Sequence, residues 1–153
     1  MTSPDSELRN HVEQDNIQLT VGYSDDEGPL FLNWYSDLPR DKTNGVLINV
    51  SEGQTFIGLL EASIKRGPQV SKFFIGEIRI EDATRLRRGY GTRMLKRAEQ
   101  IAQEYGISSI EGLIAQRNLA SIAFFTRNGY SMEEYYELGL PQYRTFKSLQ
   151  LPQ

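Results

Sequence analysis

The sequence contains no cysteine and a single histidine, His11. Without cysteine there can be no disulfide, no thiolate metal site and no cysteine nucleophile. With one histidine in a polar N-terminal stretch, neither a histidine-rich metal centre nor a Ser-His-Asp triad is expected. We therefore expect a chemistry that uses no metal, no thiol nucleophile and no triad.

Long apolar runs are also missing. No run approaches the roughly 20 residues that a membrane helix needs, and the first residues lack the basic-then-apolar order of a signal peptide. We therefore expect a cytoplasmic protein with no membrane partner. The 153 residues are 39% hydrophobic and 24% charged, which suits one globular domain. Residues 1–15 are expected to be a flexible N-terminus and residues 16–153 to form the single domain.

The net charge of −3 is unevenly distributed. Residues 1–30 hold seven acidic residues and one base, whereas residues 64–97 hold ten bases and three acidic residues. The basic segment predicts that an anion binds there. A solvated surface or nucleic-acid binding would explain the same charge. The acidic overall balance and the lack of base-stacking motifs argue against nucleic acid, so no nucleic-acid partner is expected.

Hydrophobic periodicity predicts the order of the elements. Strands are expected at residues 16–23, 46–50, 55–64, 73–80, 107–115, 130–138 and 143–149, helices at 89–105 and 119–127, a short helix or irregular segment at 29–35, and turns at 39–45 and 139–141. The strand–helix–strand stretch at 73–115 predicts a right-handed crossover with parallel strands. The expected fold class is a mixed α/β (α+β) sheet with helices on both faces.

The most informative segment reads Arg87-Arg88-Gly89-Tyr90-Gly91-Thr92-Arg93 and lies between a strand and a helix. Its two glycines let the backbone approach a bulky anion, and the first helical turn offers free N–H groups and the positive end of the helix dipole. Lys96 adds a further charge. Phosphate or pyrophosphate fits such a turn. Met94 stands where a dinucleotide fingerprint would need glycine, and a tight turn that serves packing alone is the alternative.

A second segment, Asn118 to Tyr130, begins with a good helix N-cap and ends at Gly129. Ile122 and Phe125 are three residues apart, so one face of this helix is apolar. By periodicity alone the segment is a buried helix with a glycine stop.

Together the two segments resemble the GNAT superfamily of acyl-CoA-dependent N-acyltransferases. The family's Gln/Arg-x-x-Gly-x-Gly/Ala signature falls on residues 86–91, and its Asn-x-x-Ala-x-x-aromatic-Tyr-x-x-x-Gly-Phe/Tyr signature falls on residues 118–130. The stretch RGYGTRM at residues 88–94 also looks like the histone-acetyltransferase branch. The resemblance covers roughly residues 46–149 in element order.

The resemblance implies a single-domain GNAT-like fold with a mostly antiparallel sheet and a central, splayed pair of parallel strands at 73–81 and 107–115. Acetyl-CoA would lie between these strands as co-substrate. Its pantetheine would pair with backbone at Ile78, Arg79 and Ile80, and its pyrophosphate would lie on Arg87, Arg88, Gly89, Tyr90, Gly91 and Thr92. Asn118 and Phe125 would line the thioester region.

Two positions depart from the family pattern. Leu86 stands at the Gln/Arg position, with Arg85 beside it. Phe125 stands where many members have a tyrosine that protonates the leaving thiolate, and phenylalanine has no proton to give. A water or another tyrosine (Tyr130, Tyr135, Tyr136 or Tyr143) would supply the proton, or the enzyme would rely on orientation. For the general base the resemblance favours Glu77, whose alternative is a solvated residue beside Arg79.

We therefore expect an N-acetyltransferase that moves an acyl group, most simply acetyl, from acyl-CoA to a primary amine by direct attack. The alternative is a catalytically degenerate acyl-CoA sensor or interaction domain, which Phe125 would suit. The acceptor would be an amine-bearing small molecule or protein, and a homodimer is compatible with this prediction. Aromatic residues that could line an acceptor pocket, or belong to the core, are Phe31, Trp34, Tyr35, Tyr135, Tyr136 and Tyr143.

Overall fold

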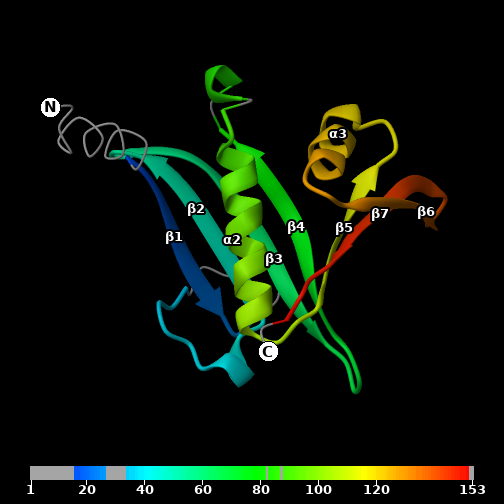
Figure 1. Ribbon diagram of the computed structural model, residues 1–153, viewed down its shortest axis with the longest axis horizontal. Helices are drawn as coiled ribbons and strands as arrows, with labels where there is room; N and C mark the ends of the chain where they lie inside the picture. The colour runs from blue at the N-terminus through cyan, green and yellow to red at the C-terminus, as the bar shows by residue number, and fades with distance from the viewer. Residues whose placement is uncertain (1–15, 27–33, 82, 87, 152–153) are drawn as a thin grey trace, which may run out of the picture.

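A seven-stranded sheet is the frame of the molecule (Figure 1). The computed structural model describes residues 16–26, 34–81, 83–86 and 88–151, so the predictions for residues 1–15, for Phe31 and for Arg87 lie outside the described part. The strands are β1 (Ile17–Ser24), β2 (Gly45–Glu52), β3 (Thr55–Arg66), β4 (Ser71–Ile80), β5 (Ser109–Ala115), β6 (Ser131–Glu137) and β7 (Leu140–Ser148). Their order is β1-β2-β3-β4-β5-β7-β6, and only β4 and β5 pair in parallel. The predicted mixed sheet with a central parallel pair is confirmed.

Two α-helices, α2 (Tyr90–Glu104) and α3 (Leu119–Arg127), lie on the same face of this sheet (Figure 1). Residues that follow α3 reach α2 directly, since the hydroxyl of Tyr130 donates to Glu99 of α2 at 2.9 Å. Both crossovers, β4-α2-β5 and β5-α3-β6, advance in the same direction along the sheet, and right-handed crossovers then place their helices on one side. Helices were expected on both faces, and most of the segment 29–35 that could supply another helix lies outside the described residues.

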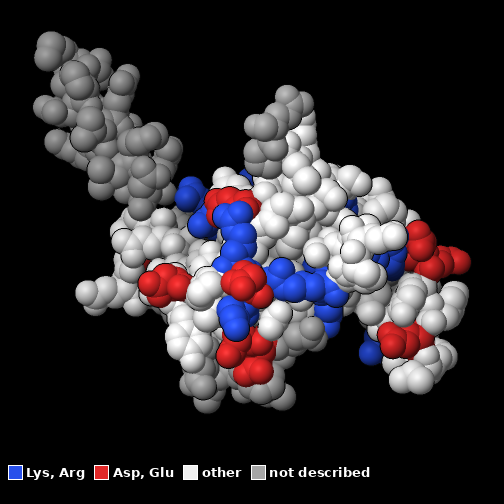
Figure 2. Space-filling model, turned by 90° about the horizontal axis from the view of Figure 1, so that it is seen from below, with Lys and Arg blue, Asp and Glu red and all other residues white. Residues whose placement is uncertain are grey.

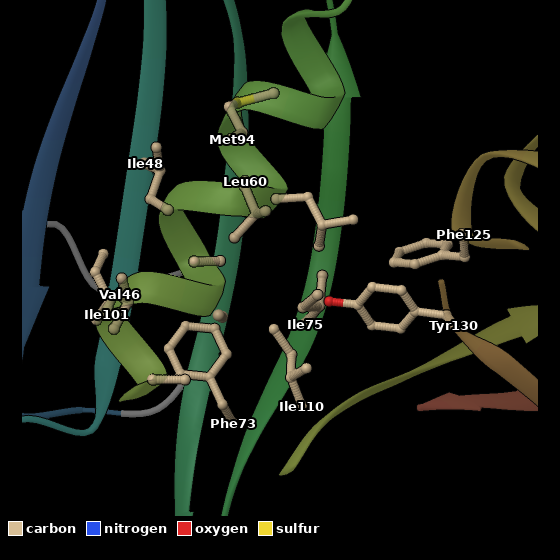
Figure 3. Packing of buried hydrophobic residues seen from close by; sticks show 14 of the residues in the cluster. Val46, Ile48, Leu60, Phe73, Ile75, Met94, Ile101, Ile110, Phe125 and Tyr130 are labelled. Atoms are coloured by element: carbon tan, nitrogen blue, oxygen red, sulfur yellow. The ribbon is translucent and has the colours of Figure 1, made fainter. Parts of the chain in front are cut away.

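The core fills the space between α2 and the sheet. The apolar stripe of α2, with Met94, Leu95, Ala98 and Ile101 fully buried, packs on inward residues of the strands. Figure 3 shows Phe73 and Ile110 beneath the helix, and Phe125 and Tyr130 entering the same cluster from the side of α3. None of the helices in the described ranges is long and apolar enough to cross a bilayer.

The hairpin between β6 and β7 is tighter than expected. A turn was predicted at residues 139–141, but Pro141 belongs to β7 and pairs with Tyr136. Leu138 and Gly139 both have positive φ, 53° and 78°, as a two-residue type I′ hairpin turn requires. Leu138 lacks the usual turn residue type, so the sequence signal for this turn was weak.

The parallel pairing of β4 and β5 is short. It joins only Phe73 with Ile110, Phe74 with Glu111 and Ile75 with Gly112. At the next residue β4 is irregular, because Gly76 has no register partner while Ile75 pairs with Ala62 and Glu77 with Glu61. Beyond this point the two strands diverge, as Figure 1 shows.

Gly58 and Gly76 provide a test of this packing. A Cβ on Gly58 would overlap the backbone oxygen of Arg79, whereas the nearest atom to a Cβ on Gly76 is the backbone oxygen of Glu61 at 3.6 Å. We expect Gly58→Ala to lower the free energy of unfolding by about 1–3 kcal/mol, because backbone cannot yield as a side chain can. Gly76→Ala, the matched control, should change it by less than about 1 kcal/mol. Urea denaturation measures both, and equal stability of the two variants would contradict the packing described.

Candidate active site

A wedge-shaped cleft of about 270 Å³ opens where β4 and β5 diverge. Its walls come from both strands and from α3, and its lining includes Ile75 to Ile78 and Gly112 to Ala115. Since no described residue pairs with β4 on its β5 side after Ile75, its backbone groups there can pair with an extended ligand. Ile78 lines the wedge as predicted, while Arg79 and Ile80 continue along the same edge without lining it.

The start of α2 forms a second hollow of about 400 Å³. Gly89 is the helix N-cap with φ 84°, a left-handed conformation that favours glycine, and a Cβ there would meet nothing within 4 Å. The first turn therefore presents its N–H groups to open space, at the positive end of the helix dipole. Besides residues 89–92, Phe124 and Arg127 line this hollow. We call it the anion cradle, and Gly89, Tyr90, Gly91 and Thr92 lie in it as predicted.

The side chain of Tyr90 turns away from the cradle. It is 4% exposed, and its hydroxyl donates to Glu52 at 2.6 Å, a hydrogen bond that raises the pKa of Tyr90. Arg85 donates to the same carboxylate at 2.9 Å. Tyr90 can therefore offer only its backbone to an anion, and its side chain ties the start of α2 to β2. Arg85 is likewise used in this anchor, and Leu86 is exposed.

Gly91 lines the cradle and also makes a close contact with α3. Both glycines were expected to open space for the anion, but a Cβ on Gly91 would lie 3.1 Å from Cε1 of Phe124. Gly91 therefore lets α2 and α3 approach each other. Phe124 lines both the wedge and the cradle, so the two hollows meet at its ring. Asn128 holds this contact in place by donating to the Phe124 carbonyl at 2.8 Å and to the Thr92 hydroxyl at 3.4 Å.

The beginning of α3 borders the wedge. The side chain of Asn118 accepts from the N–H of Ser121 at 3.2 Å, which is the predicted N-cap. Both residues line the wedge. Asn118 is exposed, so its side-chain amide can also reach a ligand there.

Phe125 lines the wedge with an almost fully buried ring. It packs edge-to-face on Phe124 and on Tyr130, with ring centroids 5.2 Å apart in each pair. The residues that line the wedge, all of them in the described part, include no tyrosine. Tyr130 is committed to Glu99, and burial followed by the charge of Glu99 raises the pKa of the Tyr130 hydroxyl. Tyr135 and Tyr136 are exposed on β6.

Glu77 lies at the wedge on the sheet face opposite the helices, because it pairs with Glu61 while the core residue Ile78 pairs with Leu60. The Glu77 carboxylate accepts from Arg79 at 2.8 Å. Glu77 therefore lines the wedge, as a general base would, and also lies beside Arg79, as the alternative expected. Glu61 faces it from β3. Burial, the charge of Glu77 and a hydrogen bond to Glu77 raise the pKa of the Glu61 carboxyl.

The basic segment does not form one continuous surface. Several of its bases pair with acidic residues: Lys72 with Glu111, Arg79 with Glu77 and Glu81, Arg85 with Glu52, and Arg97 with Glu104. Figure 2, which views the end of the molecule where α2 finishes, shows blue and red side chains interleaved. Arg88, Arg93 and Lys96 are exposed near the start of α2. Only some of the basic residues of the segment 64–97 therefore lie around the cradle.

Arg127 and Glu61 were missed in the sequence. Arg127 lies in the last turn of α3 and reaches the cradle only because α3 crosses the start of α2, a contact that the sequence does not reveal. Glu61 did carry a signal, since it is the one carboxylate inside the apolar run at 56–64. Within the described ranges, no group of three or more His, Asp or Glu side chains could hold a metal ion.

Comparison with known proteins agrees with this geometry. The sequence model of the Acetyltransferase (GNAT) family matches residues 7–130. No curated protein sequence matches the chain. Among solved structures, Naa50 of Arabidopsis thaliana, in complex with the bisubstrate analogue CoA-Ac-MVNAL, is similar with a TM-score of 0.62 and 13% identity, over 88% of this chain and 99% of that one.

Two archaeal and bacterial enzymes are similar as well. The PaiA N-acetyltransferase of Thermoplasma acidophilum, in complex with coenzyme A, gives a TM-score of 0.61 and 17% identity over 71% of this chain, which spans 64% of that protein. The IAA acetyltransferase of Bacillus cereus gives a TM-score of 0.57 and 20% identity over 69% of this chain and 79% of that one. These likenesses establish the fold, and the family match covers most of the sequence. The chain therefore belongs to the acetyltransferase (GNAT) family.

Proposed function

We propose that the protein is an N-acetyltransferase that moves an acetyl group from acetyl-CoA to a primary amine. The observation that carries this proposal is the continuity of the anion cradle with the wedge around the ring of Phe124. One hollow suits a pyrophosphate and the other offers an unpaired strand edge, so a ligand that is anionic at one end and extended at the other fits both. PaiA, in complex with coenzyme A, and Naa50, with its CoA-containing analogue, support the same ligand.

Each part of the chain has a distinct task in this proposal. Gly89 to Thr92 would hold the pyrophosphate with backbone N–H groups, and Arg127 would add a charge from α3. The edge of β4 from Gly76 to Ile80 would pair with the pantetheine amides. Asn118 and Phe125 would border the thioester. Bound acetyl-CoA supplies an acyl group that is already activated, which suits a site without a metal or a thiol nucleophile.

The protein's own contribution to the chemistry is orientation and proton removal. Holding the amine against a thioester gains much of the rate, since orientation alone can lower a barrier by several kcal/mol. Glu77 faces the wedge and can take a proton from the amine. With no tyrosine among the described residues that line the wedge, proton delivery to the departing sulfur falls to the amine itself or to water.

The second candidate function is an acyl-CoA sensor, and the same absence of a tyrosine at the wedge favours it. The two functions differ in turnover. Release of free thiol in the presence of a broad set of amines supports the enzyme. Tight binding of acetyl-CoA without thiol release on any amine supports the sensor. The absence of cysteine makes the thiol assay free of protein background.

Binding of acetyl-CoA tests the site directly. At a ligand concentration of 100 Kd, acetyl-CoA should stabilise the protein by about 2.7 kcal/mol, measured as a rise in Tm. Arg127→Ala should raise the Kd about tenfold, because a charge-assisted hydrogen bond to phosphate is lost. Gly89→Val should abolish the rise, since valine opposes the positive φ and covers the exposed N–H groups.

Lys42→Ala is the matched control for Arg127→Ala. Lys42 is an exposed base in the short 3-10 helix at Arg40–Lys42. The next residue, Thr43, lies within hydrogen-bond distance of Tyr105, which is at the opposite end of α2 from the cradle. The loss of Lys42 should leave the Kd unchanged. Calorimetry that detects no binding of acetyl-CoA to the unaltered protein would refute the proposal.

Tyr130 offers a separate test of the leaving-group step. Its hydroxyl donates to Glu99 and does not line the wedge. Tyr130→Phe should therefore leave kcat within about twofold while lowering the free energy of unfolding by about 1–3 kcal/mol, the cost of leaving Glu99 without that donor. Steady-state kinetics and urea denaturation measure the two effects. A large fall in kcat with unchanged stability would instead identify Tyr130 as the proton donor.

A further inference from the structure

The sheet face opposite the helices carries a row of facing residues. The register pairs Gly22 with Leu47, Leu47 with Glu61, and Glu61 with Glu77, so all four positions project to one face of neighbouring strands. No described α-helix covers this face. The row leads from the edge of the sheet at β1 to the wedge, since Glu77 lines the wedge.

A hollow of about 260 Å³ lies at the other end of this row. Trp34 and Tyr35 form one side of it, and Gly22, Leu47 and Asn49 belong to its floor. Trp34 packs directly on Gly22, where a Cβ would lie 3.2 Å from the Cβ of Trp34. The missing side chain at Gly22 therefore lets the tryptophan lie over the sheet. Trp34, Tyr35 and Leu47 give the hollow its aromatic and apolar part, beside the polar residues Thr20, Ser36 and Asn49.

The spacing of strands sets the distance between the hollow and the carboxylates. Neighbouring strands lie about 4.8 Å apart, so Leu47 is about 5 Å from Glu61 and about 10 Å from Glu77. That span matches a primary amine with a short linker to one ring or aliphatic group. The hollow is smaller than the 300–1,000 Å³ typical of pockets for drug-sized ligands, so it suits a single group of this kind.

Glu61 lies next to Glu77 in this row and has an unusual environment. Its Oε2 is buried without a hydrogen-bond partner among the described residues. Burying an unpaired carboxylate oxygen is costly, and a protonated amine placed between Glu61 and Glu77 would supply the missing donors. Other carboxylates on this face lie in ion pairs, since Glu77 and Glu81 both accept from Arg79, and Glu111 pairs with Arg144 and Lys72. The unpaired oxygen of Glu61 is therefore the acceptor that a bound ammonium would gain beside Glu77.

We propose that the acceptor is an apolar primary amine that binds on this face, with its ammonium between Glu61 and Glu77 and its aromatic or aliphatic body over Leu47 beside Trp34. The inference rests on the proposed acetyltransferase function. A polyamine would need a further unpaired carboxylate, and a peptide would extend beyond a hollow of this size. Because Glu77 belongs to both the pair and the wedge, an amine held there faces the thioester region.

The proton balance of this arrangement closes. The carboxylate pair accepts one proton from the bound ammonium. The free amine nitrogen then forms the C–N bond with the acetyl carbon, and the C–S bond breaks. The second nitrogen proton passes to the departing sulfur. The products are the amide and the thiol, and the proton that the pair accepted leaves for solvent.

Acceptor preference is the first test. Thiol release from acetyl-CoA is measured with ethylamine, 2-phenylethylamine, spermidine and a short peptide with a free N-terminus. Burial of a phenyl group predicts that kcat/KM for 2-phenylethylamine exceeds that for ethylamine by about 10- to 100-fold. Trp34→Ala should bring this ratio towards one.

The carboxylate pair is tested with matched variants. Glu61→Gln should raise KM for 2-phenylethylamine about tenfold, and Glu61→Asp should recover part of the loss. Glu81→Gln, which removes a carboxylate of the same strand face as Glu77 that also pairs with Arg79, is the control and should leave KM unchanged. The rise in Tm with acetyl-CoA should persist in all three variants, which shows that each one folds and keeps the cofactor site.

The outcomes separate the two proposals. If acetyl-CoA neither stabilises the unaltered protein nor releases thiol with any amine, the proposed function fails. If thiol is released but the two monoamines are used equally, or Trp34→Ala leaves their ratio unchanged, the apolar acceptor is overturned. A preference for spermidine or for the peptide also overturns it, in favour of a polyamine or a protein N-terminus. Equal KM values for Glu61→Gln and Glu81→Gln overturn the role of Glu61.

Discussion

The early end of the parallel pairing between β4 and β5 is the constraint on which the rest of the structure depends. Three residue pairs join these strands, and the irregularity at Gly76 follows at once. A longer ladder would close the sheet and leave no wedge. Because the ladder stops, the edge of β4 that faces β5 is left without a described partner, and the carboxylate of Glu77 reaches the same opening from the sheet face opposite the helices. Residues from both faces of the sheet therefore line this gap.

A diverging strand pair stays open only if both halves of the sheet are held from outside. α2 packs on β2, β3 and β4, and the second half is tied to it by side chains. Glu99 of α2 accepts from Tyr130 and from Lys147 of β7, while Phe124 of α3 lies on Gly91. These contacts cross the wedge on its buried side. They fix the distance between cradle and wedge without filling either hollow, which a ligand that occupies both requires.

The sequence predicted the elements well because most of them have strong local signals. Periodicity located α2 and α3 to within a residue, and the alternation of apolar residues located the strands. The hairpin at Leu138 was misjudged because leucine is an unusual residue at positive φ. The arrangement of both helices on one face could not be seen in the elements alone, since it depends on β7 lying between β5 and β6.

The sequence predicted the parts of the candidate site that depend on backbone conformation better than the parts that depend on side-chain contacts. Gly89 and the N-cap Asn118 have local signatures that survive in the structure. The side chains of Tyr90 and Arg85 donate to Glu52, a partner that the sequence does not reveal, because only the fold brings β2 beside the start of α2. Arg127 and the pairing of Glu61 with Glu77 arise from contacts between elements far apart in the chain.

Phe125, at the position where the family resemblance leads us to expect a tyrosine, has a physical consequence for the proposed reaction. In the proposed acetyl transfer no tyrosine lines the wedge in the described part, so the nitrogen that attacks can itself protonate the departing sulfur, since it must lose a proton in the same step. The remaining proton of the ammonium has to leave on the opposite sheet face, where the carboxylates lie. Burial and mutual repulsion raise the pKa of Glu61 above that of an ordinary carboxyl, which makes it a stronger base. A site that lacks an acid on one face of the sheet therefore gains most from a carboxylate pair on the other.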